Sequence, residues 1–448
     1  MAFSYHPPTR SFCEICEQLD ATDNRKPIIE TIDGKASSAN GYPFHDWYNF
    51  VLGFTPTFPE YMIRTENISN SDIVLDPFVG SGTTQLVCKL HEIESIGVDA
   101  NDFMVYAAIE KLNWNRDVSR ITRSLDIITD DYKNRINSLN MDDQQLVIKT
   151  ALEYRPEMLD QRYISHKPLI KIYLLKQTIE EADLSDELKS FFSFALTSIL
   201  VPVSNVKYGP GFGIGKIKDD VDVIMIFHEQ IARMINDLRM VTKKQIRTKA
   251  NTLLGDVREL SKNIKDETIS LIITSPPYPG DHEYTKHSRI ELIFCGMATD
   301  LSSFRTIKKR MLRASTTNIY KDDNDKSTVC NNKSIIEVTK EIDARLKADG
   351  ATSGFEKLYS KLVWEYFGGM SIALSECLKV LRPGGKIALL VSDSHAFKMV
   401  HIKTAVILSQ IGQEVGFINP EIHLWQMKNS TSHKYKLREN ILIMQKSF

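Results

Sequence analysis

Two short apolar runs of this chain end abruptly in turn-forming residues, and both predict buried strands of a parallel sheet. The run Leu271–Thr274 precedes Ser-Pro-Pro-Tyr, and the run Val74–Asp76 precedes a Gly-Ser-Gly turn. Apolar runs of this kind are typical of strands that are covered on both faces. Pro276 and Pro277 cannot continue a strand, because proline lacks an N–H and has a fixed φ. We therefore expect a stiff loop at the carboxyl end of the strand, where ligands bind in open α/β sheets.

The spacing of apolar residues divides the rest of the chain into segments that predict strands and segments that predict helices. Between residues 115 and 250 the apolar residues recur at helical spacing with little strand signal, which predicts a large helical insertion. The glycine-rich stretch Lys207–Lys216 inside it is interpreted as a mobile linker, in preference to a loop that touches DNA. Other predicted elements are strands at 95–99, 253–256, 387–391 and 438–444, and helices at 84–90 and 358–378, the latter possibly disturbed at Gly368-Gly369.

These elements give the following predicted organisation: an N-terminal extension (1–40), a first sheet segment (41–114), the helical insertion (115–250), a second sheet segment (251–299), a basic insertion (300–360) and a C-terminal sheet segment (361–448). Within the basic insertion, residues 322–326 are expected to form an exposed or disordered turn.

Composition places the chain among soluble globular proteins and excludes few functions. The net charge is −1, which argues against an all-round basic coat but not against a local basic patch. We expect neither a membrane span nor a signal peptide. The six cysteines are scattered, and the Cys13-x-x-Cys16 pair has no second pair at zinc-site spacing, so we expect no metal site.

The two loops offer chemistry that suits a nucleotide-like ligand and a planar base. In the first, the Ser275 hydroxyl and the Pro276 carbonyl can accept hydrogen bonds from an exocyclic amine, and the Tyr278 ring can stack on the base. In the second, the glycines let the backbone approach a ligand, and the following helix N-terminus offers free N–H groups. Asp99, at the end of the next strand, is well placed for ribose hydroxyls.

Together, Asp76-Pro-Phe-Val-Gly-Ser-Gly-Thr-Thr84 and Ser275-Pro-Pro-Tyr278 resemble the S-adenosylmethionine-dependent DNA amino-methyltransferases, which methylate N4 of cytosine or N6 of adenine. The resemblance implies an α/β fold of the class I (Rossmann-like) methyltransferase type, with a mostly parallel seven-stranded sheet and a large helical insertion. Its implied catalytic residues are Ser275, Pro276, Pro277 and Tyr278. Its implied cofactor-binding residues are Phe58, Asp76, Pro77, Phe78, Gly80, Ser81, Gly82, Thr83, Thr84, Asp99 and Asp256.

Three of these cofactor assignments carry specific roles. Asp76 either caps the turn or attracts the ammonium group of the cofactor, and the two roles are compatible. The resemblance implies that Asp256 accepts from the adenine amine. An aromatic segment before the glycine turn implies that Phe58, ahead of Phe54 and Trp47, packs under the methionine part of the cofactor.

The mechanism implied is the flipping of a base out of duplex DNA and methylation of its amino nitrogen, with Tyr278 stacked on the extruded base. A serine at the first loop position favours N4 of cytosine over N6 of adenine. The Pro-Cys pattern of the carbon-5 cytosine enzymes is absent from the sequence, so we expect no covalent cysteine. Two other classes stay open: an RNA amino-methyltransferase, and a binding protein built on an inactive methyltransferase fold.

A basic cluster in the second insertion is the predicted DNA contact: Arg305, Lys308, Lys309, Arg310 and Arg313. Phosphate contacts there would make binding strongly salt-dependent. A cytoplasmic, nucleoid-associated enzyme is expected, in a restriction-modification or related context where a cognate endonuclease acts separately. The sequence leaves the recognition site and the choice between monomer and dimer open.

Overall fold

The computed structural model describes residues 27–31, 42–208, 211–242, 246–280, 283–350, 353–429 and 436–448. The Cys13/Cys16 pair lies outside these residues. Across the described parts of the chain, no helix is both long and apolar enough to cross a membrane.

A seven-stranded sheet forms the centre of the molecule, with the strand order β5-β2-β1-β6-β7-β9-β8. The neighbours from β5 to β7 run parallel, and β9 is antiparallel to both β7 and β8. The strands are β1 (Ile73–Asp76), β2 (Glu94–Asp99), β5 (Ala250–Leu254), β6 (Ile269–Thr274), β7 (Leu381–Ser392), β8 (Ile418–Asn429) and β9 (Lys436–Gln445). This order confirms the predicted class I, Rossmann-like fold, and it reverses between β1 and β6, where such sheets bind ligands.

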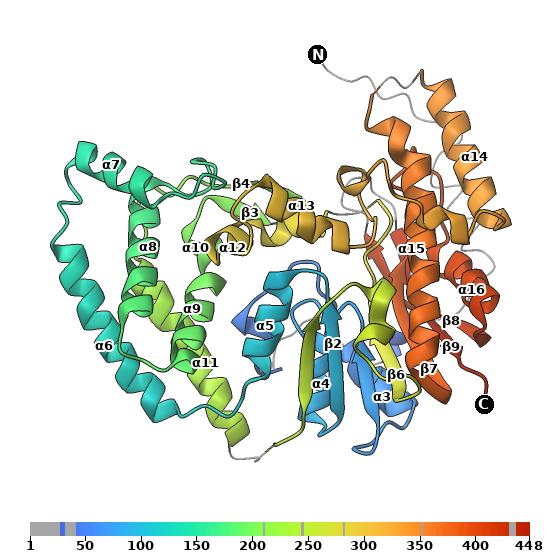
Figure 1. Ribbon diagram of the computed structural model, residues 1–448, viewed down its shortest axis with the longest axis horizontal. Coiled ribbons are helices and arrows are strands. Elements are labelled where there is room, and N and C mark those ends of the chain that lie inside the picture. Colours follow the sequence, from blue (N-terminus) through green and yellow to red (C-terminus); the bar gives the residue numbers. More distant parts are fainter. Residues whose placement is uncertain are drawn as a thin grey trace.

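Helices cover both faces of the sheet, which explains the uninterrupted apolar runs (Figure 1). On one face, Leu271 and Ile273 pack in one core with α3 (Thr57–Thr65) and α4 (Thr83–Leu90). On the other, Ile272 packs in a second core with α15 (Tyr359–Val380) and α16 (Thr404–Val415). All six residues of β6 are buried, so an alternating pattern is not needed there.

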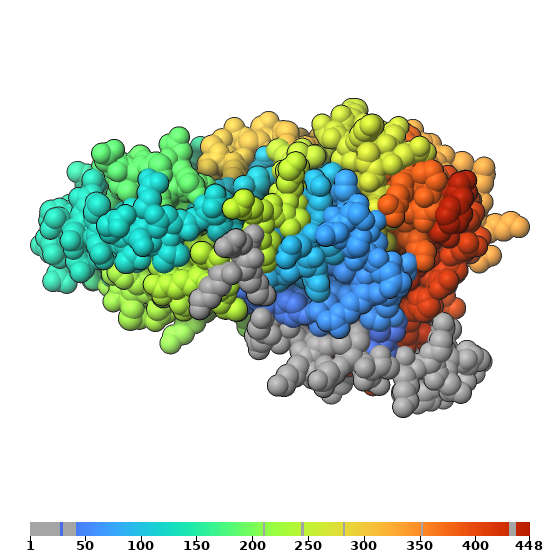
Figure 2. Space-filling view, turned by 90° about the horizontal axis from the view of Figure 1, so that it is seen from below, coloured from blue at the N-terminus to red at the C-terminus, as the bar shows by residue number. Residues whose placement is uncertain are grey.

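The helical insertion forms an arm beside the sheet and makes up one end of the molecule (Figures 1 and 2). Its apolar core is continuous with α5 (Asp102–Leu112) and with the aromatic segment around η1 (His45–Trp47). Trp47 Nε1 donates to Asp237 of the arm at 2.8 Å. The arm contains α6 (Val118–Asn137), α7 (Gln144–Tyr154), α8 (His166–Glu181), α9 (Asp186–Ser198), α10 (Leu200–Val203) and α11 (Val223–Thr242).

The glycine-rich stretch of the arm is a β-hairpin, so its interpretation as a mobile linker is wrong. Strands β3 (Val206–Tyr208) and β4 (Phe212–Ile214) pair antiparallel, and residues 209 and 210 lie outside the description. Tyr208 Oη donates to the buried carboxylate of Glu291 at 2.9 Å. The Phe212 ring packs edge-on against Tyr163. These contacts are long-range, which is why glycine content alone pointed to a linker.

The second insertion packs onto the C-terminal half of the chain, and it contains more helix than its polar composition suggests. It comprises α13 (Leu301–Arg310), η4 (Thr316–Asn318), η5 (Asp325–Thr328), α14 (Lys333–Ala348) and η6 (Glu356–Leu358), and it is preceded by η3 (Tyr284–Ser288) and α12 (Arg289–Phe294). Residues 322–326 were expected to be exposed or disordered, but the Asp323 side chain is only 8% exposed and is paired with Arg313. This expectation is therefore wrong for Asp323.

The glycine pair Gly368-Gly369 does not interrupt α15, which is continuous from Tyr359 to Val380. Instead, it lets η5 approach the helix closely. A Cβ at Gly368 would lie 2.2 Å from the backbone oxygen of Asp325. Such a distance is too short for any side chain, so the contact requires glycine.

We expect Gly368→Ala to lower the free energy of unfolding by about 1–3 kcal/mol, the range seen when a packed interface is overfilled. In an open helix the same change would stabilise the protein, because alanine is the better helix former. Thermal unfolding measures the difference. Gly354→Ala is a matched control, because nothing lies within 4 Å of its Cβ position. Unfolding temperatures of Gly368→Ala at or above wild type would contradict the close packing of η5 on α15.

Candidate functional site

The glycine-rich turn connects β1 to α4 at the carboxyl edge of the sheet. Gly80 and Gly82 have φ of 50° and 92°, values that favour glycine. Gly82 is the N-cap of α4. The N–H of Gly80 donates to Asp99 Oδ2 at 2.9 Å, so the turn is held against the end of β2. The turn thereby joins the ends of β1 and β2 at the amino end of α4.

Asp76 is a completely buried brace beneath this turn and not a ligand-facing acid. Its carboxylate accepts from Thr84 Oγ1 and from Thr274 Oγ1, both at 2.6 Å, and from the N–H of Phe78 at 3.1 Å. Burial raises its pKa to about 6, against the lowering effect of these hydrogen bonds. Of its two predicted roles, the structure supports the bracing of the turn. Attraction of a cofactor ammonium is not supported, because both Asp76 and Thr84 are 0% exposed.

Asp99, in contrast, faces an open cleft at the end of β2. Its carboxylate accepts from the N–H groups of Gly80 and Asn101 at 2.9 and 2.8 Å. Burial raises its pKa to about 6, which the two backbone hydrogen bonds partly offset. Each carboxylate oxygen has further acceptor capacity. The position therefore suits a pair of ribose hydroxyls.

The cleft joins both predicted loops, and the empty space in it, including space that is open to solvent, is about 990 Å³. The predicted site residues that line it are Pro77, Phe78, Gly80, Ser81, Thr83, Asp99, Ser275, Pro277, Lys308 and Arg310. The others lie behind or beside it: Phe58, Asp76, Gly82, Thr84, Asp256, Pro276, Tyr278, Arg305, Lys309 and Arg313.

Within residues 54–63, Phe54 and not Phe58 lines the cleft. Phe58 is 0% exposed and packs edge-on against both Phe54 and Trp425. The assignment of Phe58 to the cofactor is therefore wrong. The helical spacing of the segment places Phe58 on the inner face of α3, and the loop before that helix carries Phe54.

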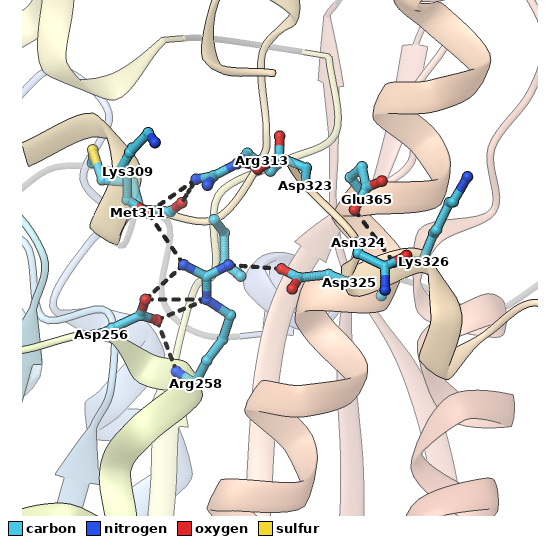
Figure 3. Close-up of polar contacts among 12 residues, drawn as sticks. Asp256, Arg258, Lys309, Met311, Arg313, Asp323, Asn324, Asp325, Lys326 and Glu365 are labelled. Atoms are coloured by element: carbon cyan, nitrogen blue, oxygen red, sulfur yellow. Dashed lines mark hydrogen bonds and ion pairs between the residues drawn. The ribbon is translucent and has the colours of Figure 1, made fainter. Parts of the chain in front are cut away.

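Asp256 is held by an arginine two residues further along (Figure 3), and its acceptance from the adenine amine stays a prediction. Arg258 Nε and Nη2 bind the two carboxylate oxygens of Asp256 at 2.9 and 2.6 Å, and Nη1 binds Asp325 at 2.7 Å. Both carboxylate oxygens are thus engaged by the guanidinium, in the strong bidentate geometry. The neighbours Gly255 and Val257 line the cleft in its place.

The Ser-Pro-Pro-Tyr loop leaves β6 beside β7. Ser275 Oγ donates to the backbone oxygen of Leu390 at 3.0 Å and lies 3.1 Å from Tyr278 Oη. Tyr278 Oη points into the protein, where Glu439 Oε1 lies 3.1 Å away. The Tyr278 ring is partly exposed, so stacking on a base stays a prediction. Tyr284 lines the cleft, and its hydroxyl accepts from the N–H of Tyr278 at 3.3 Å.

The basic cluster of the second insertion is largely neutralised by acids from other parts of the chain. Lys308 pairs with Glu283 at 3.3 Å, Lys309 with Asp322 at 3.3 Å, and Arg310 with Asp102. Arg313 pairs with Asp323 at 2.9 Å and is 6% exposed, so its assignment as a phosphate contact is wrong. Arg305 lies 6.0 Å from the Tyr320 ring.

These ion pairs hold α13 over the cleft. Lys308 and Arg310 both line the cleft. Lys308 pairs with Glu283, which follows the proline loop, and Arg310 pairs with Asp102 at the start of α5. Arg258 adds a third link, because it also donates to the backbone oxygen of Lys309 at 3.3 Å (Figure 3). Figure 1 places α13 between the helical arm and α15. The segment predicted to contact DNA therefore forms a wall of the ligand cleft.

Some residues that line the cleft were not singled out from the sequence, among them Phe50, Asn101 and Val257. A usable signal existed for Asn101, which caps α5 by accepting from the N–H of Phe103. Among the described residues, no group of three or more His, Cys, Asp or Glu side chains could hold a metal ion.

Comparison with known proteins agrees with this geometry. A family model described as DNA methylase, of the N6 and N4 methyltransferases, matches residues 43–110. The Type II methyltransferase M.BsoBI of Geobacillus stearothermophilus is 23% identical over 98% of this chain and 91% of its own length. The Type II methyltransferase M.AvaI of Nostoc sp. PCC 7120 is 21% identical over 84% of this chain and 79% of its own length.

A solved structure is also similar, at a low level. The SAM-dependent O-methyltransferase of Thermotoga maritima shares 7% identity, with 88% of this chain and 67% of that chain covered and a TM-score of 0.29. The strand order, and not this overlap, establishes the fold.

Proposed function

We propose that this chain, which is similar to the DNA amino-methyltransferases, uses S-adenosylmethionine to methylate the N4 amino group of cytosine in duplex DNA. The observation that carries the proposal is that Ser275 lines the same cleft as Asp99 and Phe78. The cofactor half and the proline loop thus share one space. A methyl donor held by the first can face an amine held by the second.

The cleft residues fit the cofactor's parts. Asp99 offers acceptors to the ribose, and Phe78 and Val257 offer apolar surface to the adenine. Phe54 supplies an aromatic wall near the glycine turn. When bound, S-adenosylmethionine supplies a methyl group that its positive sulfonium already activates. The protein's contribution is therefore alignment, which is worth roughly 7–11 kcal/mol in well-oriented reactions.

The orientation of the Ser275 hydroxyl supports its role as an acceptor. The Leu390 backbone oxygen can only accept, so the serine proton points to it and away from the cleft. The oxygen lone pairs then face the cleft and can take an N–H of the target amine. A base amine is a poor nucleophile, because its lone pair is delocalised into the ring. An acceptor on its N–H favours the pyramidal form that attacks.

The choice of cytosine over adenine rests on the neutral serine at this loop position. Members of the family with aspartate or asparagine there favour adenine, as the sequence resemblance implies. N6-adenine methylation is the second candidate, and it uses the same cleft and cofactor. An RNA amine as substrate is the third.

Base flipping is part of the proposal, since the amine lies inside the duplex. Unstacking costs a few kcal/mol, which stacking in the enzyme offsets in part. Tyr284 lines the cleft and Tyr278 flanks it, so both are candidates for this contact. We further propose a nucleoid-associated, cytoplasmic enzyme of a restriction-modification system whose endonuclease is a separate protein. DNA contact through the more exposed Arg305 and Lys309 is part of this proposal.

We expect wild-type enzyme and labelled cofactor to form N4-methylcytosine in unmethylated genomic DNA. Nucleoside mass spectrometry identifies the product. N6-methyladenine instead would keep the enzyme class and overturn the assigned base. Methylation of tRNA or rRNA with none on DNA would overturn DNA as the substrate. Heat-denatured DNA is a useful comparison, because it removes the need for base flipping.

A further inference from the structure

A buried carboxylate on β9, Glu439, lies directly behind the proline loop. Its side chain is 1% exposed. Its carboxylate accepts from Tyr278 Oη at 3.1 Å and from Gln426 Nε2 and Lys428 Nζ of the neighbouring strand β8. Strands β8 and β9 thereby connect the sheet edge to the loop that carries Ser275.

An ion pair at this place needs an explanation other than stability. Burying a carboxylate is costly, and replacing a buried pair by apolar residues is often neutral or stabilising. Lys428 lies at the surface, with 45% of its side chain exposed. The carboxylate itself is enclosed and faces the hydroxyl of a predicted catalytic residue. Buried polar groups without an evident structural benefit are candidates for a functional role.

The count of hydroxyl protons makes the role specific. Ser275 and Tyr278 each have one such proton, and four oxygens compete for them: the two hydroxyls, the Leu390 backbone oxygen and the Glu439 carboxylate. Tyr278 Oη can donate to Glu439 at 3.1 Å, to Ser275 Oγ at 3.1 Å or, over a longer 3.5 Å, to the backbone oxygen of Leu390. If it donates to Ser275, it occupies one of the two lone pairs of Oγ and leaves a single one for the substrate amine. The charged carboxylate is the stronger acceptor, so the tyrosine proton goes to Glu439.

Tyr278 remains a donor throughout the working pH range. Burial and the neighbouring Glu439 raise the pKa of its hydroxyl well above the usual value. The charged and titratable groups named around Glu439 are Lys428 and Tyr278. Because the raised pKa keeps the Tyr278 hydroxyl protonated near neutral pH, we interpret the arrangement as a fixed orienting device.

We propose that Glu439 is a positioning residue for methyl transfer, which holds the Tyr278 hydroxyl proton away from Ser275 Oγ and so keeps the serine oxygen free to accept from the target amine. This inference rests on the proposed role of Ser275 as the amine acceptor. It adds a residue that lies 161 positions from Tyr278 in sequence and contacts the loop through the Tyr278 hydroxyl.

The test is a double-mutant cycle on the full-length enzyme with Glu439→Gln and Tyr278→Phe. We expect Glu439→Gln to lower kcat about fivefold, because it replaces a charged acceptor by a neutral one and weakens this hydrogen bond by about 1 kcal/mol. KM for DNA and Kd for S-adenosylmethionine should change by less than about twofold. In the Tyr278→Phe background no hydroxyl proton remains to misplace, so Glu439→Gln should then have almost no effect on kcat.

Lys428→Met is the matched control, because it removes the ion pair and keeps the carboxylate that accepts from Tyr278. All rates are taken per cofactor-binding molecule, so partial unfolding of a variant does not enter. Unchanged kcat in Glu439→Gln would overturn the inference. If Glu439→Gln lowers kcat equally with and without the Tyr278 hydroxyl, the inference is also overturned. A loss of kcat in Lys428→Met as large as in Glu439→Gln would overturn it too, because the effect would then belong to the ion pair.

The cycle separates this inference from the proposed function. If Ser275→Ala retains full activity, the loop mechanism itself fails, whatever Glu439 does. If Ser275→Ala is inactive and Glu439→Gln is fully active, only the positioning role fails.

Discussion

Ser275→Ala is expected to lower kcat for methyl transfer by roughly 10²-fold or more, comparable to the loss of one preorganised hydrogen-bonding group in other enzymes. The variant removes the oxygen that accepts from the target amine as its nitrogen becomes pyramidal. Binding of S-adenosylmethionine should stay within about twofold of wild type, because Asp99 and the glycine turn are untouched. Single-turnover methylation of a DNA substrate measures the chemical step, and calorimetry measures cofactor affinity.

A control for Ser275→Ala must keep the loop folded and remove a similar group. Ser394→Ala serves, because its hydroxyl donates to the backbone oxygen of Pro279, just past the loop. We expect that variant to retain most of its activity. A Ser275→Ala enzyme with the same single-turnover rate as wild type would contradict the assignment of the serine as acceptor, while leaving the cofactor site intact.

Residues whose role is set by local chain geometry could be predicted from the sequence. Gly80, Gly82 and Asp99 sit at the ends of short strands, where the carboxyl edge of a parallel sheet fixes their position. Ser275 follows an apolar run that ends in two prolines. The seven-stranded sheet follows from the same runs, since their continuous apolar character requires cover on both faces.

Residues whose role depends on long-range partners could not be predicted in this way. Asp76 and Asp99 both end strands and look alike in sequence, but Asp76 meets Thr274 of a strand almost 200 residues away and is sealed beneath the turn. Arg258 engages Asp256 and brings in Asp325. Glu439 gave no signal at all, because a lone acid in a C-terminal strand is indistinguishable from a solvated one.

The basic cluster illustrates the same limit at the level of charge. Five cations within nine residues suggested a phosphate-binding surface. The structure pairs four of them with Glu283, Asp322, Asp102 and Asp323. Those acids are distant or sit in a segment that appeared disordered. These ion pairs hold α13 as a wall of the cleft, and they connect it to Asp102 at the start of α5 and to Glu283, which follows the proline loop.

Asp99→Asn is expected to weaken S-adenosylmethionine binding by about 30-fold. Hydrogen bonds to a charged acceptor are worth roughly 1 kcal/mol more than those to a neutral one. Two ribose hydroxyls that donate to one carboxylate then account for about 2 kcal/mol, which corresponds to about 30-fold in Kd. The asparagine oxygen can still accept from the N–H of Gly80 or Asn101, so the turn should keep its shape. Calorimetric titration measures the affinity, and Asp102→Asn, which touches Arg310 instead, tests whether any nearby charge has the same effect.

The pH dependence of cofactor binding gives the same assignment an independent check. Burial raises the pKa of Asp99 to about 6, so the carboxylate is ionised at pH 7.5 and mostly neutral at pH 5. Kd for wild type should therefore rise as the pH falls below 6, approaching tenfold per unit, and this slope should flatten in Asp99→Asn. A residual slope would report Asp76, whose pKa is also raised to about 6.

Acid unfolding caused by Asp76 and Asp99 cannot explain a rise in Kd at low pH. A raised carboxyl pKa means that the folded state binds more protons than the unfolded state between about pH 4 and 6. Their contribution to stability therefore increases as the pH falls through 6, while cofactor affinity decreases. A wild-type Kd that is flat from pH 7.5 to 5 would contradict the ribose-binding role of Asp99.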